Sequence, residues 1–527
     1  MRRNFYLGFA ILLVLLGLFL AVLHSFIVFL CILIVLALIW LYDVTQKKHA
    51  ILRNFPVLGH IRFVLEFLRP EIRQYFIAGD TEEKPFDRLV RSVIYQRSKK
   101  LEDTVPFGTE RDILANGYEW VQHSLAPKHI SEIEPRITVG GPQCKQPYSA
   151  SRLNISAMSF GALSKNAVLA LNKGAKIGGF AHNTGEGGLS EYHLAGGGDI
   201  TWQIGTGYFG CRNAEGNFDA DLFAEKVAHE QVKMIEIKLS QGAKPSHGGI
   251  LPAEKLTQEI AEIRHVPMGQ DVFSPPAHTA FSTPKGLLEF VQQLRDLSGG
   301  KPVGFKLCVG RRVEFLAICK AMLETKILPD FITVDGAEGG TGAAPLEYSN
   351  HVGMPLNDGL IFVHNALVGV GLRDDIRVIC SGKVATGFDM VTKIALGADM
   401  CNAARAMMMS LGCIQSRQCN VNTCPTGVAT QNPRLARGLV VDQKKYRVAN
   451  FHAGTMKSFL ELIGAMGFTN PGDLHPRHVM RRIAQDDART YSEIYEYLKP
   501  GALLQDKLPK NFEKLWKQAN AAYFSAA

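Results

Sequence analysis

The first 42 residues differ from the rest of the chain because nearly all of them are apolar. As one α-helix, residues 5–42 would be about 57 Å long, nearly twice the hydrocarbon thickness of a bilayer. Leu23-His24-Ser25 is the only polar interruption. The pattern therefore predicts a transmembrane helical hairpin over residues 1–43, with spans at 5–23 and 26–42. A single span or a re-entrant segment is the alternative.

Basic residues flank this apolar segment on both sides. Arg2 and Arg3 precede it, and Lys47, Lys48 and Arg53 follow it. Because lysine and arginine concentrate in cytoplasmic loops, both ends are predicted to lie in the cytoplasm. No short apolar core is followed by a small-residue cleavage site, so a signal peptide is not predicted. We expect a protein of the inner (cytoplasmic) membrane whose catalytic domain faces the cytoplasm.

Residues 44–150 combine helical patterns with many charges. In residues 88–97, apolar positions recur three and four apart, which is the period of an amphipathic helix. We interpret 44–150 as a helical stem between the membrane segment and the catalytic body. Its basic start, 47–73, could contact anionic lipid head groups, but a solvated helix face is the simpler explanation of these charges.

From residue 151, short apolar runs ended by glycine or polar loops alternate with helical stretches. The runs are 152–158, 234–238, 303–307, 331–334, 377–380 and 400–403. Strands that alternate with helices predict a parallel sheet in an α/β fold. The number of units favours a closed TIM-type (β/α)8 barrel over a doubly wound sheet. We assign the barrel to 151–470 and a helical C-terminal tail to 471–527.

Composition narrows the function classes only slightly. The net charge of +9 is small for 527 residues, and no basic run alternates with aromatic residues. Nucleic-acid binding is therefore not predicted. The ten cysteines lack the dense, even spacing of a disulfide framework, which favours a reducing compartment.

Three cysteines, Cys413, Cys419 and Cys424, lie in one short polar loop, and Pro425 directly follows the last. Iron–sulfur clusters require thiolate ligands, and proline after a ligating cysteine recurs in ferredoxin loops. Three local ligands favour a [3Fe-4S] cluster over [4Fe-4S]. Structural zinc wants four nitrogen or sulfur ligands, and no histidine lies near this loop. Zinc and unligated thiols are the alternatives.

Glycine-rich segments after the later predicted strands are candidate cofactor contacts. In such barrels, phosphate binds to the loops after the seventh and eighth strands. Ser381-Gly382-Lys383 follows the predicted seventh strand, and Ala404-Arg405 follows the eighth. Gly339-Gly340-Thr341-Gly342 would let a cofactor approach the main chain. The segment 205–210 fits the dinucleotide fingerprint, but a turn-rich stretch follows it instead of a helix, so nicotinamide binding is not predicted.

Four motifs together resemble the glutamate synthase family. They are Asn183-Thr-Gly-Glu186-Gly-Gly, Ile237-Lys-Leu-Ser-Gln-Gly-Ala-Lys244-Pro, Gly339-Gly-Thr-Gly-Ala343 and the cysteine loop. They occur in the order of the family's synthase domain. The resemblance implies a flavin-binding barrel that holds FMN beside an iron–sulfur cluster. FMN exchanges a hydride and the cluster passes single electrons, so the pair would couple a one-electron donor to two-electron reduction.

The resemblance also implies roles for individual residues. Lys306, on a barrel strand, would place a positive charge near the flavin, although strand lysines are more often solvated. Glu186 is the candidate proton handler and, with Lys244, a candidate catalytic residue. A surface ion pair is the ordinary alternative for each charged residue. The loop after the first strand would lie against the flavin through Met158, Ser159, Gly161 and Ala162. The cations matching the family's 2-oxoglutarate site are Lys238, Lys244 and Arg264.

The chain departs from the family pattern at Ile250, where the family has a glutamine that contacts substrate. Isoleucine lacks the hydrogen-bond donor and acceptor of that glutamine. Sites built on hydrogen bonds discriminate sharply between substrates, so this difference predicts that the substrate need not be 2-oxoglutarate. Ala403 and Ala404 stand where glycines are expected. The amidotransferase part has no counterpart here, because Met1 precedes the apolar segment instead of a catalytic cysteine. We therefore expect ammonia or an amine from solution or from a separate amidotransferase.

These observations predict a membrane-anchored FMN and iron–sulfur oxidoreductase. It would reductively aminate a 2-oxo acid, most simply 2-oxoglutarate to glutamate, with electrons from a ferredoxin-like protein or a separate reductase. An N-alkylglutamate synthase is a close variant. The alternative class, favoured by Ile250, is a flavin and cluster electron-transfer module without amination activity.

Overall fold

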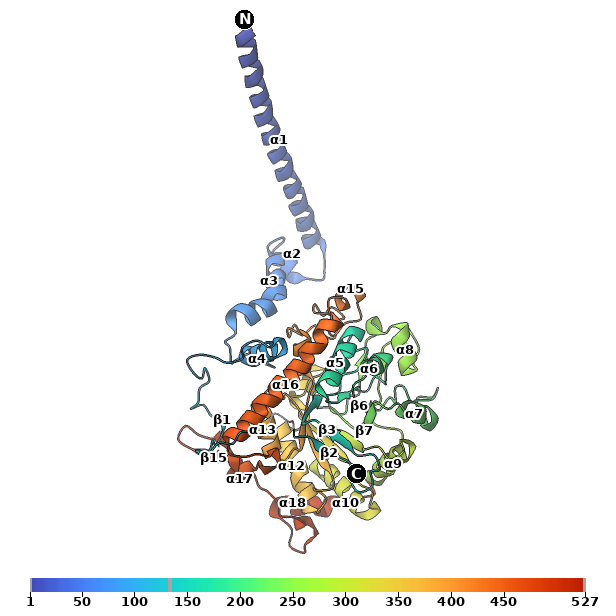
Figure 1. Cartoon of the computed structure of the whole chain (residues 1–527). Helices are drawn as coiled ribbons and strands as arrows, with labels where there is room; N and C mark the ends of the chain where they lie inside the picture. The colour runs from blue at the N-terminus through green and yellow to red at the C-terminus, as the bar shows by residue number, and fades with distance from the viewer. Residues whose placement is uncertain (1, 131–134, 525–527) are drawn as a thin grey trace. The chain divides into compact units, whose positions relative to one another are not determined.

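The computed structural model describes residues 2–130 and 135–524 (Figure 1). The chain forms two compact units, Met1–Arg88 and Leu89–Ala527.

The first unit begins with one continuous helix, α1 (Arg2–Thr45), of 44 residues. The prediction of a hairpin is therefore wrong. Residues 23–25 contain neither glycine nor proline, and the Ser25 hydroxyl donates to the Ala21 carbonyl oxygen at 2.9 Å, so nothing interrupts the helix there. The stretch Ala10–Thr45 is apolar and long enough to cross a membrane, by length and composition alone.

Short helices follow α1 in the same unit: α2 (Ala50–Asn54), α3 (Gly59–Ile72) and the π-helical turn η1 (Arg73–Ile77). The Asp43 carboxylate, near the end of α1, connects α1 to the start of α3. It lies 2.9 Å and 3.0 Å from Nε2 of His60 and accepts a 2.8 Å hydrogen bond from the Val57 backbone N–H. The start of α3 is thereby held against the end of α1.

The predicted helical stem ends early. Helix α4 (Arg88–Lys99) confirms the amphipathic pattern, but residues 100–130 and 135–150 are mostly irregular, with strands β1 (Glu119–Val121), β2 (Ile137–Val139) and β3 (Tyr148–Ala150). Pro106, Gly117, Pro127, Pro135 and Pro142 are spread through this segment and break helices.

The second unit is built on a closed barrel of eight parallel strands, which confirms the TIM-type fold. The last strand closes on the first through Cys401 opposite Leu153 and Ala403 opposite Ile155. The strands are β4 (Leu153–Ile155), β5 (His182–Asn183), β6 (Ile200–Ile204), β7 (Val232–Lys238), β10 (Val303–Cys308), β11 (Phe331–Asp335), β12 (Arg377–Ser381) and β13 (Met400–Ala403).

Helices cover the outside of the barrel (Figure 1). Several begin at side-chain caps: Ser164, Thr257 and Thr283 each accept a hydrogen bond from a backbone N–H three residues on. The helices are α5 (Lys165–Gly178), α6 (Glu191–Ala195), α7 (Ala220–Val227), α8 (Gln258–Arg264), α9 (Pro284–Leu297), α10 (Arg312–Thr325), α11 (Leu346–His351), α12 (Leu356–Gly369), α13 (Gly387–Ala395), α14 (Arg405–Leu411), α15 (Pro433–Ala436) and α16 (Val441–Ala465).

One end of the barrel is closed by the antiparallel pair β2–β3. Val139, Tyr148 and Ala150 of this pair form a buried cluster with side chains near the beginnings of barrel strands, including Met234 and Met400. The N-terminal end is therefore packed with apolar side chains. The C-terminal ends of the strands are left to carry polar chemistry.

The C-terminal tail is only partly helical, contrary to the prediction. It contains α17 (Tyr491–Ile494) and α18 (Lys510–Gln518), but also β14 (Val479–Arg482) and β15 (Ala488–Thr490). These strands pair with β1 in the order β1-β14-β15. Strands of three or four residues are too short to leave a periodic pattern in the sequence, and β14 pairs with β1 more than 350 positions away.

Candidate active site at the C-terminal ends of the strands

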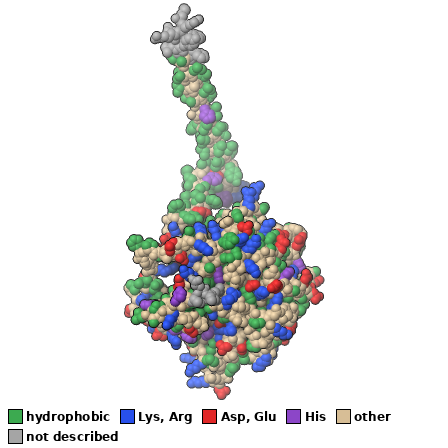
Figure 2. Space-filling view, in the orientation of Figure 1, with side chains coloured by type: hydrophobic (Ala, Val, Ile, Leu, Met, Phe, Trp, Pro, Cys, Tyr) green, Lys and Arg blue, Asp and Glu red, His purple; other side chains and the backbone are tan. Residues whose placement is uncertain are grey.

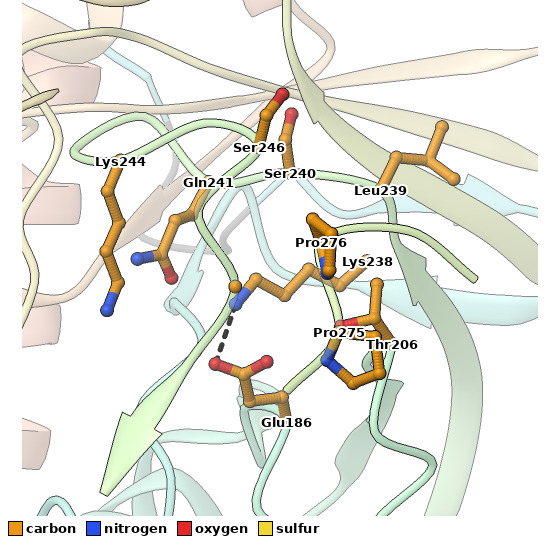
Figure 3. A pocket seen from close by; sticks show the side chains of 11 residues that line it. Glu186, Thr206, Lys238, Leu239, Ser240, Gln241, Lys244, Ser246, Pro275 and Pro276 are labelled. Carbon is orange, nitrogen blue, oxygen red and sulfur yellow. Dashed lines mark ion pairs between the residues drawn. The ribbon is translucent and has the colours of Figure 1, made fainter. Parts of the chain in front are cut away.

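A pocket opens beyond strands β5, β6 and β7 (Figure 3). Three residues predicted from the sequence line it: Glu186, Lys238 and Lys244. The other lining residues are Thr206, Leu239, Ser240, Gln241, Ser246, Gly248, Pro275 and Pro276.

A close backbone contact sets the position of Glu186. The preceding residue, Gly185, has φ +65°, and a Cβ added there would lie 2.7 Å from the Ser159 backbone nitrogen. Only glycine fits both the left-handed conformation and this contact. The Asn-Thr-Gly-Glu motif thus places its carboxylate beside the loop after β4.

Glu186 and Lys238 form an ion pair, with Oε1 2.7 Å from Nζ and both side chains mostly buried. Burial acts to raise the pKa of Glu186, but Lys238, Arg264 and Lys244 outweigh it and hold that pKa below its usual value. Burial and Lys238 lower the pKa of Lys244, which Glu186 partly offsets. The pocket therefore holds an ionised carboxylate among cations.

Arg264, also predicted as a substrate contact, is not among the residues that line this pocket. It is buried at the end of α8, where Nη2 donates to the Phe160 carbonyl oxygen at 3.0 Å and the guanidinium lies 5.0 Å from the Phe209 ring centroid. Burial lowers the pKa of Arg264 to about 10, against the opposing effect of Glu186. It acts on the pocket as a nearby positive charge.

Ile250, the departure from the family pattern, likewise lies outside the pocket lining. It belongs to the short strand β8 (Ile250–Leu251), which pairs with β9 (Val272–Phe273) through Ile250 opposite Phe273. Its side chain is half-buried.

Two buried side chains beside the pocket were missed from the sequence. Among the residues described, the Ser274 hydroxyl has no hydrogen-bond partner. A Cβ added at Gly249 would lie 3.0 Å from this hydroxyl and 2.6 Å from Oε1 of Glu186, so both groups face the same space. His278 positions Lys238: its Nε2 donates to the Lys238 carbonyl oxygen at 2.9 Å, and its Nδ1 accepts from the Tyr208 hydroxyl at 3.1 Å.

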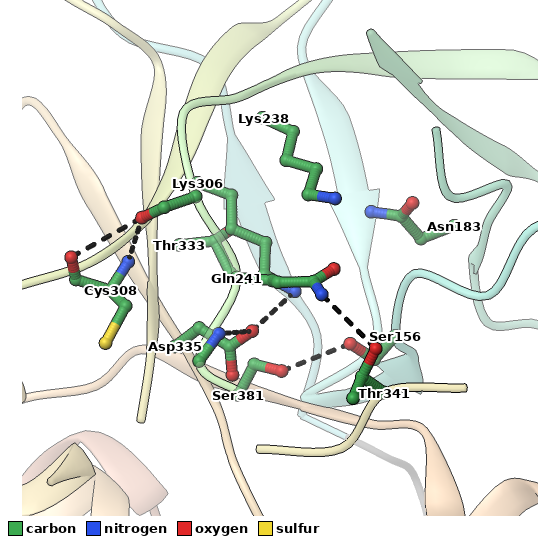
Figure 4. Close-up of polar contacts among 12 residues, drawn as sticks. Ser156, Asn183, Lys238, Gln241, Lys306, Cys308, Thr333, Asp335, Thr341 and Ser381 are labelled. Carbon is green, nitrogen blue, oxygen red and sulfur yellow. Dashed lines mark hydrogen bonds and ion pairs between the residues drawn. The ribbon is translucent and has the colours of Figure 1, made fainter. Parts of the chain in front are cut away.

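A second polar cluster fills the barrel interior (Figure 4). Lys306 pairs with Asp335 at 2.9 Å, so this lysine is buried rather than solvated. Burial acts to lower the pKa of Lys306, but Asp335 and Glu236 outweigh it and raise that pKa. Glu236 in turn accepts hydrogen bonds from Asn183 (2.8 Å), Gln203 (2.7 Å) and Thr333 (2.7 Å). Glu236 and Asp335 were not predicted as site residues. The sequence signal that could have found them is an acidic residue within or directly after an apolar strand.

The predicted cofactor loops meet at this end of the barrel. The Ser381 hydroxyl, at the end of β12, lies 3.1 Å from the hydroxyl of Ser156, which directly follows β4. Arg405 opens α14 after β13 and donates to the Glu338 carbonyl oxygen at 2.7 Å. A Cβ added at Gly340 would lie 2.9 Å from the Arg405 side chain, so the glycine-rich loop packs directly against it.

The three cysteines of the loop after α14 influence one another. Burial, with Cys419 and Cys424 nearby, raises the pKa of Cys413 to about 11. Burial acts to raise the pKa of Cys424 also, but hydrogen bonds from Thr426, Val428 and Ala429 outweigh it and lower that pKa. Within residues 2–130 and 135–524, no three metal-ligating side chains are grouped closely enough to hold a metal ion.

Two long side chains fasten the cysteine loop to the loop after β4. Lys255 Nζ donates to the carbonyl oxygens of Cys419 (2.8 Å) and Ala162 (3.2 Å). Gln431 Nε2 donates to the carbonyl oxygens of Gly161 (3.0 Å) and Leu163 (2.8 Å). Neither residue was predicted, because nothing in its local sequence reveals a partner so far along the chain.

The closed parallel barrel, with a carboxylate among ammonium groups at the C-terminal ends of its strands, defines an α/β-barrel enzyme. Residues 94–469 match the family model described as the conserved region in glutamate synthase. The chain belongs to the glutamate synthase family, whose members are oxidoreductases that act on CH–NH2 donors.

Two curated relatives illustrate the similarity. The chain is 38% identical over 486 residues to the glutamate synthase large subunit-like protein YerD of Bacillus subtilis, covering 84% of this chain and 92% of the relative. It is 33% identical over 354 residues to an archaeal glutamate synthase (NADPH) of Methanocaldococcus jannaschii, covering 67% of this chain and 65% of the relative. A crystal structure of mandelate oxidase is 14% identical, with a TM-score of 0.42, covering 76% of this chain and 96% of that one.

Proposed function

We propose that the chain is a membrane-anchored, FMN- and iron–sulfur-dependent oxidoreductase that reductively aminates a 2-oxo acid, most simply 2-oxoglutarate to glutamate. The observation that carries the proposal is the Glu186 carboxylate held between Lys238 and Lys244 in one pocket. The reaction would consume the 2-oxo acid, ammonia, two electrons and two protons, and release the amino acid and water.

The pocket residues suit these reactants. Lys244 and Lys238 offer the ammonium groups that a carboxylate-bearing substrate needs. Glu186 is held ionised, so it can accept a proton from ammonium or return one to a carbinolamine oxygen as water leaves. The Ser274 hydroxyl, without a partner among the described side chains, is a further donor for a substrate oxygen. His278 fixes the backbone of Lys238 and so holds the pair in place.

The barrel mouth fits FMN. Ser381, Gly382 and Lys383, with Ala404 and Arg405, would hold its phosphate; Lys306 and the loops at 158–162 and 339–342 would contact the ring system. The glycines at 340 and 382 leave room that a side chain would fill, since a Cβ at Gly382 would lie 3.2 Å from Leu356. FMN would supply the hydride for the reduction.

The cysteine loop would supply three thiols for a [3Fe-4S] cluster, although within the described residues they are not grouped closely enough to hold a metal ion. The hydrogen bonds that lower the pKa of Cys424 favour its thiolate, which is the form that binds iron. Replacing Cys424 by serine should remove iron from the anaerobically purified protein while flavin is retained. The matched control is Cys144→Ser, which lies outside the loop. Zinc in place of iron would overturn this part of the proposal.

The remaining partners follow from the reaction. Electrons would come from a ferredoxin-like protein or a reductase, and ammonia from solution or a separate amidotransferase. Helix α1 would anchor the chain in the cytoplasmic membrane, with the barrel facing the cytoplasm. An N-alkylglutamate synthase would use an alkylamine instead. An electron-transfer module without amination is the second candidate, favoured by Ile250 at a family substrate position.

One experiment separates these functions. The full chain is purified without oxygen, reduced, and mixed with 2-oxoglutarate plus ammonium, with methylammonium in a parallel sample and no amine in a control. Flavin reoxidation with glutamate identified by mass spectrometry supports the proposal. An N-methyl product only with methylammonium favours the variant. A reduced spectrum that stays unchanged in all samples would favour the electron-transfer module.

A further inference from the structure

Helix α3 presents an apolar face that no described residue of its own unit, 1–88, covers. Ile61, Val64, Leu65, Leu68 and Ile72 are spaced three and four residues apart, so they form one stripe along the helix. Each is between 36% and 56% exposed. In a soluble protein such a stripe normally packs against the core, and an uncovered one marks an interaction surface.

The apolar surface extends beyond this helix. In η1, which continues directly from α3, Phe76 is 85% exposed and Ile77 is 69% exposed. Arg62 and Glu66 lie on the opposite face of α3, where they form an i,i+4 pair at 3.9 Å. The helix is therefore two-sided, with an exposed apolar side.

Contacts of Asp43 determine where α3 begins. This carboxylate is fully buried, and it binds His60 and the Val57 backbone N–H. Asp43 itself lies at the end of the long apolar helix α1, whose side chains from Ala10 to Tyr42 are nearly all exposed (Figure 2). The start of α3 is thus fixed at the point where the apolar part of α1 ends.

The charges around α3 indicate what kind of partner covers its apolar face. Between residues 46 and 77 there are six basic residues and two acidic ones, Glu66 and Glu71, which gives a net charge of 6 − 2 = +4. The basic residues are Lys47, Lys48, Arg53, Arg62, Arg69 and Arg73. Basic residues beside an exposed apolar stripe are the pattern of a helix that lies in the interface of an anionic bilayer.

We propose that α3 lies in the plane of the membrane surface, in the leaflet from which α1 emerges. Its stripe enters the acyl boundary, and its arginines contact anionic head groups. This inference rests on the proposed anchoring by α1. It replaces the simpler sequence interpretation of a solvated helix face, because solvation explains the charges but leaves the exposed stripe unexplained.

Site-specific photo-crosslinking of the full chain in vesicles tests the proposal. Benzophenone is introduced by Val64→p-benzoylphenylalanine or Leu68→p-benzoylphenylalanine on the stripe, with Glu66→p-benzoylphenylalanine on the opposite face as the matched control. We expect lipid adducts from positions 64 and 68 and few from 66. Adducts with residues 89–527 of the same chain, or with a second copy, would overturn the proposal, as would equal lipid labelling at all three positions.

The lipid requirement provides a second readout. In vesicles with phosphatidylglycerol, Arg69→Gln with Arg73→Gln should lower the adduct yield at position 64 on the order of 20-fold, since each basic residue contributes roughly a fivefold preference for an anionic surface. An unchanged yield, or the same yield in purely zwitterionic vesicles, would contradict the role of these charges. Circular dichroism checks that the variants fold.

Alkaline carbonate extraction separates this inference from the anchoring on which it depends. A chain released by carbonate would show that α1 does not span the bilayer. A chain that resists extraction but gives no lipid adduct at positions 64 and 68 would refute the placement of α3 alone.

Discussion

The Glu186 carboxylate lies 2.7 Å from the Lys238 ammonium group, although Glu186 follows β5, Lys238 ends β7, and β6 separates these two strands in the barrel. Both side chains are mostly buried, so removal of either partner would leave an uncompensated buried charge. The pair therefore has consequences for both stability and catalysis.

Glu186→Gln should lower the rate of amination at least on the order of 100-fold, because the pocket loses its proton acceptor. It should also destabilise the fold by about 3 kcal/mol, since Lys238 would stay buried without its counter-charge. Steady-state rates and denaturant unfolding measure the two effects. Glu191→Gln, at an exposed position on α6, is the control. Full activity in Glu186→Gln would remove this residue from the catalytic role.

Lys244→Ala should weaken binding of a dicarboxylate roughly 10- to 100-fold, the range expected for losing a charged hydrogen bond. Flavin content should not change, because Lys244 lies in the substrate pocket and not among the phosphate-binding loops. Isothermal titration with 2-oxoglutarate tests this, with the exposed Lys457→Ala as control. Equal affinities in both variants would exclude Lys244 from the site.

His278 should make stability fall with acidification. Burial lowers the pKa of folded His278 to about 4, against 6.5 for an ordinary histidine. Between pH 6.5 and pH 4 the His278 side chain is protonated in the unfolded chain but neutral in the folded chain. Its contribution to the stability of the fold is therefore complete above pH 6.5 and is lost as pH falls toward 4.

The measurement is the slope of the unfolding free energy against pH. His278→Gln should flatten that slope by about 1.4 kcal/mol per pH unit between the two pKa values, the effect of one proton. His229→Gln, on the exposed surface, should leave it unchanged. Identical slopes in the two variants would contradict the assignment.

Gln431→Leu should loosen the loop after β4. The variant removes the Gln431 donor from the Gly161 carbonyl oxygen, which costs about 1–3 kcal/mol, and leaves the Leu163 carbonyl oxygen with the Gly161 backbone N–H. Because that loop is the proposed flavin contact, flavin should dissociate severalfold more readily on dilution, as followed by fluorescence. Gln443→Leu, exposed on α16, is the control. Flavin release equal to that of the control would show that the two loops are not coupled.

The barrel could be predicted from the sequence because its strands are local patterns. The predicted runs 331–334 and 400–403 match β11 (Phe331–Asp335) and β13 (Met400–Ala403) closely. Glu186, Lys238 and Lys244 were found because family motifs mark them, and they do share one pocket. The length of the apolar segment and its polar interruption suggested a hairpin turn at residues 23–25, but these residues contain no helix breaker and α1 continues through them.

Other features depend on contacts between distant segments, which no local pattern reveals. Lys255 reaches Cys419 and Gln431 reaches Gly161 only after the barrel has brought their loops together. Arg264 was predicted from a family motif to contact the substrate. It packs against Phe209 instead and does not line the pocket.

The sheet β1-β14-β15 makes the two borders of the catalytic unit depend on each other. Arg482 exchanges backbone hydrogen bonds with Gly117 and Tyr118, so residues before the barrel are held by residues after it. Proteolytic trimming of the last fifty or so positions would strip β1 of its partner and leave an unpaired edge prone to self-association. We therefore expect a recombinant fragment that contains only the barrel to aggregate. A soluble fragment should include both β1 and the strands β14 and β15.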